Sequence, residues 1–301
     1  MVMEIIKVAE DNKEKLYDYA ACHGAEHDSS YLPGRDFDFS AEYPSYLLME
    51  NNEVIGAVCL MRTKRFLSSY KARFSIFHAV QSSTEPYAML LKAIQPHIQD
   101  LRSVFLFIPE EKENTAVILK GLGFGIERYS FILESRDPPQ IAPVFPEGIS
   151  VQPLDPADLE GIAQFADCIN QEFKGLAGHT PSAVEDIQTW FEDQSYLEGG
   201  LCLLKKGQEP IGTIGLMRDL DDMDAGEIGA FGILREYRGL NLGRNLLRYG
   251  IQFLVRKGFN PLVLSVNGEN RGAIKLYESE GFLLTDSVVC YRLEREKNDK
   301  A

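Results

Sequence analysis

The sequence predicts an α/β protein built from two similar domains in tandem. Its 301 residues exceed the usual size of one domain, and a hydrophobic content of 45% is enough for two packed cores. Prolines gather near the midpoint, where residues 138–148 are expected to form a linker. Strands and helices recur in the same order on both sides of it, which indicates an internal duplication. We therefore expect one domain over residues 1–137 and a second over residues 149–301.

The elements of the two halves can be matched in order. Each half has an apolar hairpin, a further apolar strand, a helix with a Leu-Leu pair, another strand, and a Gly-Phe pair where a last strand begins. The matched segments are 46–61 and 201–217, 74–80 and 228–234, 90–91 and 246–247, 104–108 and 261–266, and 123–124 and 281–282.

The second half contains a strand, a turn and a helix start that suit a phosphate group. The apolar strand from Glu227 to Ile233 leads to the turn Arg238-Gly-Leu-Asn-Leu-Gly243, and a helix-forming run follows from Arg244. A helix start presents unpaired N–H groups and the positive end of the helix dipole. The sequence therefore predicts a phosphorylated ligand at this turn.

The spacing excludes two familiar nucleotide sites. A dinucleotide fold needs Gly-x-Gly-x-x-Gly and an acidic residue about 20 positions later; this chain has Val263 there. A nucleoside triphosphate loop needs four residues between its glycines and then Lys-Ser/Thr. Three residues separate Gly239 from Gly243, and Arg244-Asn245 follow.

Two motifs resemble those of the GNAT family of acyl-CoA N-acyltransferases. The turn resembles the family's pyrophosphate loop, Arg/Gln-x-x-Gly-x-Gly/Ala, except that Asn241 stands at the middle Gly. Asn tolerates the left-handed backbone region better than most residues with a side chain, so we expect the turn to form. The run from Asn270 to Phe282 matches the family's Asn-x-x-Ala-x-x-Leu-Tyr-x-x-x-Gly-Phe at every specified position.

The resemblance implies that each half is a GNAT domain, a mixed (α+β), mostly antiparallel sheet flanked by helices, and that the second half binds acetyl-CoA as co-substrate. The strand from Glu227 would splay from its neighbour, and its glycines mark a bulge or a close backbone approach. The residues that the resemblance assigns to the cofactor are Phe231, Gly232, Ile233 and Asn270 along the pantetheine arm, and Arg238, Gly239, Leu240, Asn241, Leu242, Gly243 and Arg244 at the pyrophosphate.

The resemblance implies catalytic roles for two residues. Glu227 stands where several family members carry a general base, and an apolar cleft would raise its pKa toward neutrality. Tyr277 is the family's usual general acid, which protonates the departing CoA sulfur. Three alternatives stay open: Glu227 as an ordinary solvent-facing glutamate, Tyr277 as a core aromatic residue, and Arg238 as the partner of a surface carboxylate.

The first half lacks these groups. The segment from Gln81 to Tyr87, without Arg or Gly, stands where the second half has its phosphate turn, and Leu119 stands where it has Tyr277. We predict that the N-terminal domain is catalytically silent. Whether it binds a ligand of its own stays open.

Composition limits the partners. A net charge of −14 argues against nucleic acid, and five single cysteines are typical of reduced thiols in a cytosolic protein. No signal peptide and no apolar run of roughly 18 residues is present, so we expect a cytoplasmic protein without a membrane partner. His23 and His27 have helical ligand spacing, but Gly24 lies between them, and no metal site is predicted.

Together these observations predict an N-acetyltransferase, monomeric or homodimeric, whose C-terminal domain transfers an acetyl group from acetyl-CoA to a primary amine. The amine, on a small molecule or a peptide, would attack directly in a ternary complex and dock near residues 155–198. The alternative is a non-enzymatic acyl-CoA-binding or sensor protein of the same fold. The sequence leaves the amine and the acyl-chain length open.

Overall fold

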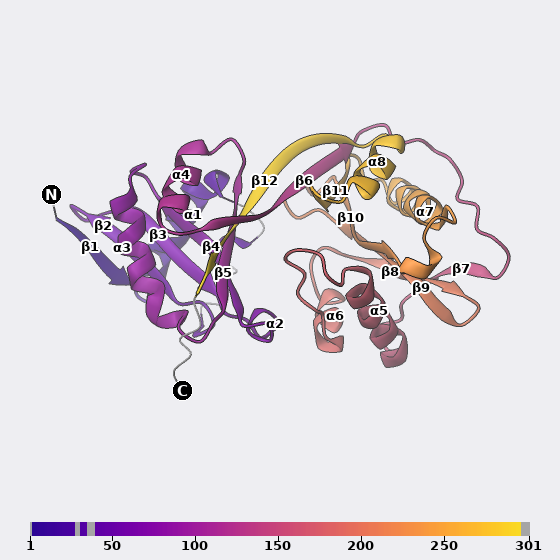
Figure 1. The fold of residues 1–301 in the computed structure, drawn as a ribbon, viewed down its shortest axis with the longest axis horizontal. Helices are drawn as coiled ribbons and strands as arrows, with labels where there is room; N and C mark the ends of the chain where they lie inside the picture. Colours follow the sequence, from indigo (N-terminus) through magenta and orange to yellow (C-terminus); the bar gives the residue numbers. More distant parts are fainter. Residues whose placement is uncertain (1, 28–30, 35–39, 296–301) are drawn as a thin grey trace. The chain divides into compact units, whose positions relative to one another are not determined.

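The computed structural model describes residues 2–27, 31–34 and 40–295. The chain divides into two compact units (Figure 1): unit 1 is Met1–Tyr129 with Ser287–Ala301, and unit 2 is Ser130–Asp286. The predicted fold class, an α/β chain with mostly antiparallel sheets flanked by helices, is confirmed. No helix within the described ranges has the length and apolar character needed to cross a membrane.

Unit 1 contains a mixed sheet with the strand order β1-β2-β3-β4-β5-β12, in which only β4 and β5 are parallel. Its elements are β1 (Met3–Lys7), α1 (Lys13–His23), the 3₁₀ turn η1 (Gly24–Glu26), β2 (Ser45–Glu50), β3 (Glu53–Met61), α2 (Lys64–Leu67), β4 (Lys71–Ala79), α3 (Thr84–Ile94), η3 (Gln95–His97), β5 (Ser103–Pro109), α4 (Glu113–Gly121) and most of β12 (Leu283–Glu294).

Helices cover both faces of this sheet. Neighbouring residues of a strand point to opposite sides, so each strand contributes side chains to the cores on both faces. On β4, Ile76 packs in one core with Leu16 of α1, and Phe77 packs in the other with Leu90 of α3. The side chains of β4 thus alternate between the α1 face and the α3 face.

Unit 2 has the same arrangement, with the strand order β6-β11-β10-β9-β8-β7 and a single parallel pair, β10 with β11. Its elements are most of β6 (Gly125–Ser135), β7 (Ile149–Pro153), α5 (Leu159–Glu172), α6 (Val184–Trp190), β8 (Tyr196–Lys206), β9 (Glu209–Arg218), β10 (Gly226–Ile233), η4 (Arg235–Tyr237), α7 (Leu242–Arg256), β11 (Leu262–Asn267) and α8 (Arg271–Ser279).

Two cores enclose the sheet of unit 2. Cys202 and Leu204 of β8 pack with α7, whereas Leu201 and Leu203 pack with α5 and α6. Figure 1 shows α7 and α8 on one side of these strands and α5 and α6 on the other. Both faces of the sheet are therefore buried, and functional side chains have to lie at its edges or strand ends.

The compact units differ in extent from the domains expected at residues 1–137 and 149–301. Residues 130–135 of β6 pair with β11 in unit 2, and residues 288–294 of β12 pair with β5 in unit 1. The terminal strand of each half of the sequence thus contributes to both units. Residues 138–148 contain neither helix nor strand, and Val144 donates its N–H to Asn245 Oδ1 of α7 at 2.9 Å.

Candidate active site

The strands β10 and β11 of unit 2 separate partway along their length. They pair only from Gly226 to Ile228, although β11 continues to Asn267 against β6. On the other side of β10, the register with β9 shifts between Gly229 and Gly232, and Ala230 there has a φ of +43°. The bulge that the glycines predicted is present. The second part of β10 therefore has main-chain groups without a ladder partner on β11, open to an extended ligand.

Gly232 is a glycine because a carboxyl group occupies the place of its side chain. A Cβ on this residue would lie 2.4 Å from Glu172 Oε2. Glu172 ends α5 and is 7% exposed, so α5 delivers a buried carboxyl group to the bulge of β10. Glu172 belongs to no motif and was not among the predicted site residues; its signal in the sequence is a glycine inside a strand, Gly232.

Thr213 connects Glu172 to the bulge of β10. Thr213 Oγ1 lies 2.6 Å from Glu172 Oε2 and 2.7 Å from the carbonyl oxygen of Ala230. The hydroxyl has one proton, so it donates to only one of these two oxygens at a time. Burial raises the pKa of Glu172 to about 8 and so favours its protonated form. A neutral carboxyl group and a hydroxyl thus tie α5 to the bulge.

Glu227 opens β10, where it pairs with Met217 of β9 and Val263 of β11. It is partly buried, and burial, followed by the charges of Asp219 and Asp221, raises its pKa. A carboxyl group in this setting takes up a proton more readily than an exposed one.

Tyr277 of α8 lies beside the separated part of β10. Its ring centroid is 5.9 Å from that of Phe231 and 6.3 Å from that of Phe282. Burial raises the pKa of Tyr277, so the hydroxyl keeps its proton at neutral pH. Within the described ranges this hydroxyl has no hydrogen-bond partner, and its proton is available to a ligand.

The predicted phosphate turn leaves the first N–H groups of α7 uncapped. Gly239 and Asn241 adopt the left-handed conformation, with φ of +80° and +60°, and no side chain caps the helix at Asn241. The first turn of α7 carries no acidic residue. The first main-chain N–H groups and the positive end of this long helix are therefore not neutralised by a capping side chain or an acidic residue of the helix's first turn.

The two arginines of the turn are held by the protein. Arg238 donates from Nε to the carbonyl oxygen of Ile233 at 2.8 Å and from a terminal nitrogen to that of Glu172 at 3.4 Å. Arg244 and Arg248 form ion pairs with Glu280, a fully buried carboxylate beside α8. These contacts hold the three arginine side chains against the protein and stabilise the turn. The alternative partner for Arg238, a surface carboxylate, is not among the contacts within the described ranges, where its guanidinium bonds main-chain carbonyl oxygens.

Some of the predicted site residues lie close to one another in the structure, and others do not. A Cβ on Gly243 would lie 3.7 Å from Ile233 and 4.0 Å from Phe231, so the start of α7 adjoins the end of β10. Leu242 is buried and can offer only its main chain, and Leu240 is 60% exposed. Asn270 caps α8 by accepting a hydrogen bond from the N–H of Ala273 at 3.2 Å. Glu227 lies at the opposite end of β10, outside these contacts.

In unit 1, side chains of the protein occupy the region that corresponds to the candidate site of unit 2. β4 and β5 also pair only briefly, from Lys71 to Arg73, but the N–H of Phe77 donates to His27 Nε2 at 3.1 Å. The first turn of α3 contains Glu85 and Pro86, which add a negative charge and remove an N–H. These features support the prediction that the N-terminal domain is catalytically silent.

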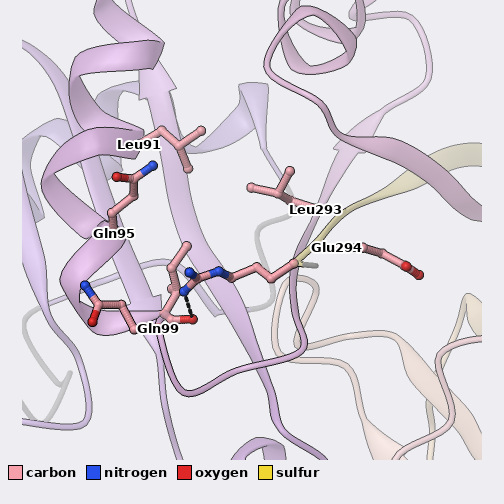
Figure 2. Close-up of a pocket in the computed structure, with 7 residues that line it drawn as sticks. Leu91, Gln95, Gln99, Leu293 and Glu294 are labelled. Carbon is pink, nitrogen blue, oxygen red and sulfur yellow. Dashed lines mark hydrogen bonds between the residues drawn. The ribbon is translucent and has the colours of Figure 1, made fainter. Parts of the chain in front are cut away.

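Other features lie outside this region. A hollow of about 270 Å³ in unit 1 is lined by Leu91, Gln95, Ile98, Gln99, Leu293, Glu294 and Arg295 (Figure 2). It contains none of the predicted site residues. All five cysteines are free, and only Cys22 is exposed, as their isolated positions predicted.

Comparisons with known proteins agree with the motifs. Residues 163–282 match the model of the Acetyltransferase (GNAT) family. A GCN5-related N-acetyltransferase from Sphaerobacter thermophilus has a TM-score of 0.70 at 19% identity, with 97% of this chain and 95% of that chain covered. A tandem GNAT protein from the clavulanic acid biosynthesis pathway has a TM-score of 0.68 at 14% identity, with coverage of 99% and 100%. These likenesses show that the fold is that of a tandem GNAT chain.

One curated protein is also similar to this chain in sequence. The mycothiol acetyltransferase of Thermobispora bispora is 27% identical over 180 residues, which cover 56% of this chain and 59% of the relative. The chain thus matches little more than half of that protein's length.

Proposed function

We propose that residues 163–282, which match the model of the acetyltransferase (GNAT) family, form a domain of that family, and that the chain transfers an acetyl group from acetyl-CoA to a primary amine. The observation that carries the proposal is the parting of β10 from β11, with the uncapped start of α7 at the end of the parted strand. An extended chain with a phosphorylated end fits both features at once.

The main chain of unit 2 would hold the cofactor. N–H groups near Phe231, Gly232 and Ile233 would bond the pantetheine arm and polarise the thioester carbonyl, while those from Gly239 to Arg244 would bind the pyrophosphate. Asn270 would contribute at the start of α8. The bulge that aims these groups is held by Glu172 and Thr213.

The chemistry would need two proton transfers. Glu227, whose pKa is raised by burial, would take a proton from the ammonium group directly or through water, and the free amine would attack the thioester carbonyl. Collapse of the tetrahedral intermediate breaks the C–S bond, and Tyr277 would give its proton to the departing sulfur. The name of the curated relative favours a small-molecule acceptor, docked near residues 155–198.

The test is release of CoA thiol by the full chain, incubated with acetyl-CoA and a panel of primary amines. We expect amine-dependent thiol release and one CoA site per chain by equilibrium dialysis. Tight CoA binding without thiol release from any amine would favour a non-enzymatic binding protein. Two equally tight sites would contradict the assignment of one active half.

A further inference from the structure

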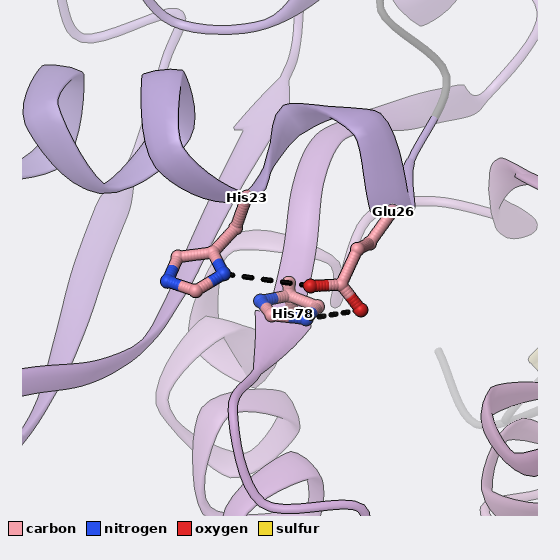
Figure 3. A group of neighbouring side chains, drawn as sticks. All are labelled: His23, Glu26 and His78. Carbon is pink, nitrogen blue, oxygen red and sulfur yellow. Dashed lines mark hydrogen bonds and ion pairs between the residues drawn. The ribbon is translucent and has the colours of Figure 1, made fainter.

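Three side chains of unit 1 converge at the end of α1 (Figure 3). His23 ends α1, Glu26 follows in η1, and His78 lies near the end of β4. His23 Nδ1 is 3.5 Å from one carboxylate oxygen of Glu26, and His78 Nε2 is 3.5 Å from the other. We propose that His23, Glu26 and His78 bind a divalent transition-metal ion, with Zn²⁺ as the best match.

The spacing of the ligand atoms suits such an ion. Zinc binds imidazole nitrogen and carboxylate oxygen at about 2.0–2.2 Å, so neighbouring ligands in a tetrahedron lie roughly 3.3–3.5 Å apart. The two 3.5 Å distances run from His23 Nδ1 and His78 Nε2 to different carboxylate oxygens of Glu26, and one ligand atom from each residue lies within 4.8 Å of the other two. Binding one ion would draw these atoms closer together, and His23 and Glu26 are both partly exposed. Two histidines and one glutamate leave the fourth position for water.

A buried residue orients the central ligand. The hydroxyl of Tyr19 lies 2.8 Å from His78 Nδ1, and both residues are 5% exposed. Because Tyr19 engages Nδ1, Nε2 is the nitrogen that faces Glu26 and the ion. Metal-binding histidines usually have their second nitrogen held in this way.

The sequence did not reveal this set, because its third member is distant in the chain. His27, the partner that helical spacing suggested for His23, is bound to the N–H of Phe77 instead. His78 occupies the position in β4 that corresponds to Gly232 in β10, so the site belongs to the half without a cofactor cleft.

One neighbouring charge opposes a metal ion. Lys112 Nζ lies 4.0 Å from Glu26 Oε2, and its side chain is 32% exposed. A bound ion would displace it into solvent. Removing this charge, by Lys112→Met, should therefore raise the affinity for the ion.

The test is titration of the untagged full chain, freed of metal by a chelator, with Zn²⁺ by calorimetry and with Co²⁺ by visible absorption. We expect one ion per chain and the absorption of four-coordinate Co²⁺. Glu26→Gln and His23→Gln, both at partly exposed positions, should weaken binding more than tenfold. His97→Gln is the matched control, since His97 in unit 1 is bonded to Tyr46 and lies outside the set.

Two results of these titrations would contradict the proposed metal site. Absence of Zn²⁺ binding would leave the three residues as an ion-paired cluster and overturn the proposal. So would binding that survives Glu26→Gln but is lost on Cys22→Ser, because Cys22 is an exposed thiol beside His23. Tyr19→Phe keeps all three ligands and should weaken binding about 10–100-fold, which provides a test if a ligand variant misfolds.

Discussion

Glu172 links the stability of unit 2 to pH through one buried proton. Its pKa is about 8 in the folded chain and 4.5 ordinarily, so the folded state holds the proton across the range between these values. The free energy of unfolding therefore falls as pH rises through this range, and the loss is complete above it. Glu172→Gln keeps the shape without the ionisation, and should remove this slope.

Denaturation curves of wild type and Glu172→Gln, followed from about pH 5 to pH 9, measure the effect. Because one pKa unit corresponds to about 1.4 kcal/mol, a pKa raised from 4.5 to about 8 should make the variant more stable than wild type at the alkaline end by on the order of 4–5 kcal/mol. Glu192→Gln alters an exposed carboxyl group of the same unit and should leave the slope unchanged. A wild-type slope that persists in Glu172→Gln would contradict the assignment.

Ionisation of Glu227 should determine how the rate of the proposed acetyl transfer depends on pH. A general base works only when ionised, so kcat/KM should rise with pH through its raised pKa. Glu227→Gln should lower kcat by about 10²–10⁴-fold and abolish this rise. Asp219→Asn removes one of the charges that raise the pKa, and should move the rise to lower pH. Initial rates across pH test both, and an unchanged profile in Glu227→Gln would remove it as the base.

At the scale of elements, the start of α7 can be tested with one added charge. Leu240 is 60% exposed in the phosphate turn, so Leu240→Glu should fold normally and place a carboxylate where the pyrophosphate would bind. CoA affinity should fall by about tenfold or more, which corresponds to about 1.4 kcal/mol. Leu159→Glu is the matched control, since Leu159 begins α5 and is 59% exposed. Equal losses in both variants by calorimetry would show that charge alone, and not the position, lowers affinity.

Local patterns predicted the elements of the site better than its contacts. The turn motif predicted left-handed backbone at Asn241 and a helix-forming run from Arg244; Asn241 is left-handed, and the helix begins two residues earlier than expected, at Leu242. Turn chemistry depends on neighbours in sequence, which the chain displays directly. Glu172 reaches Thr213 and Gly232 only after α5 packs on the sheet, and Arg238 finds its carbonyl partners in the same way. Such contacts have no period or spacing in the sequence.

The whole molecule differs from the sequence expectation in its terminal strands. The repeat predicted the order of elements in both halves, and this order is present. The repeat could not predict which sheet β6 and β12 would join. Each is an extended strand, and its alternating side chains would suit either sheet. That choice is made by pairing with β11 and β5, which are distant in the sequence.

Core substitutions in these two strands distinguish the exchanged arrangement from separate halves. Leu133 precedes the linker but is 1% exposed in the core of unit 2, and Val289 is in the second half but is 3% exposed in a core of unit 1. Leu133→Ala should destabilise unit 2 by about 2–5 kcal/mol through the lost burial and the cavity. Val289→Ala removes fewer atoms and should destabilise unit 1 by less.

Hydrogen exchange read by mass spectrometry locates each effect without reference to any ligand. Leu133→Ala should speed exchange in β10 and β11, and Val289→Ala should do so in β4 and β5, because local opening follows the weakened core. If the halves folded as 1–137 and 149–301, the pattern would reverse, with Leu133→Ala loosening β5 and Val289→Ala loosening β11. The two variants thus serve as controls for each other, and one experiment decides which unit each terminal strand completes.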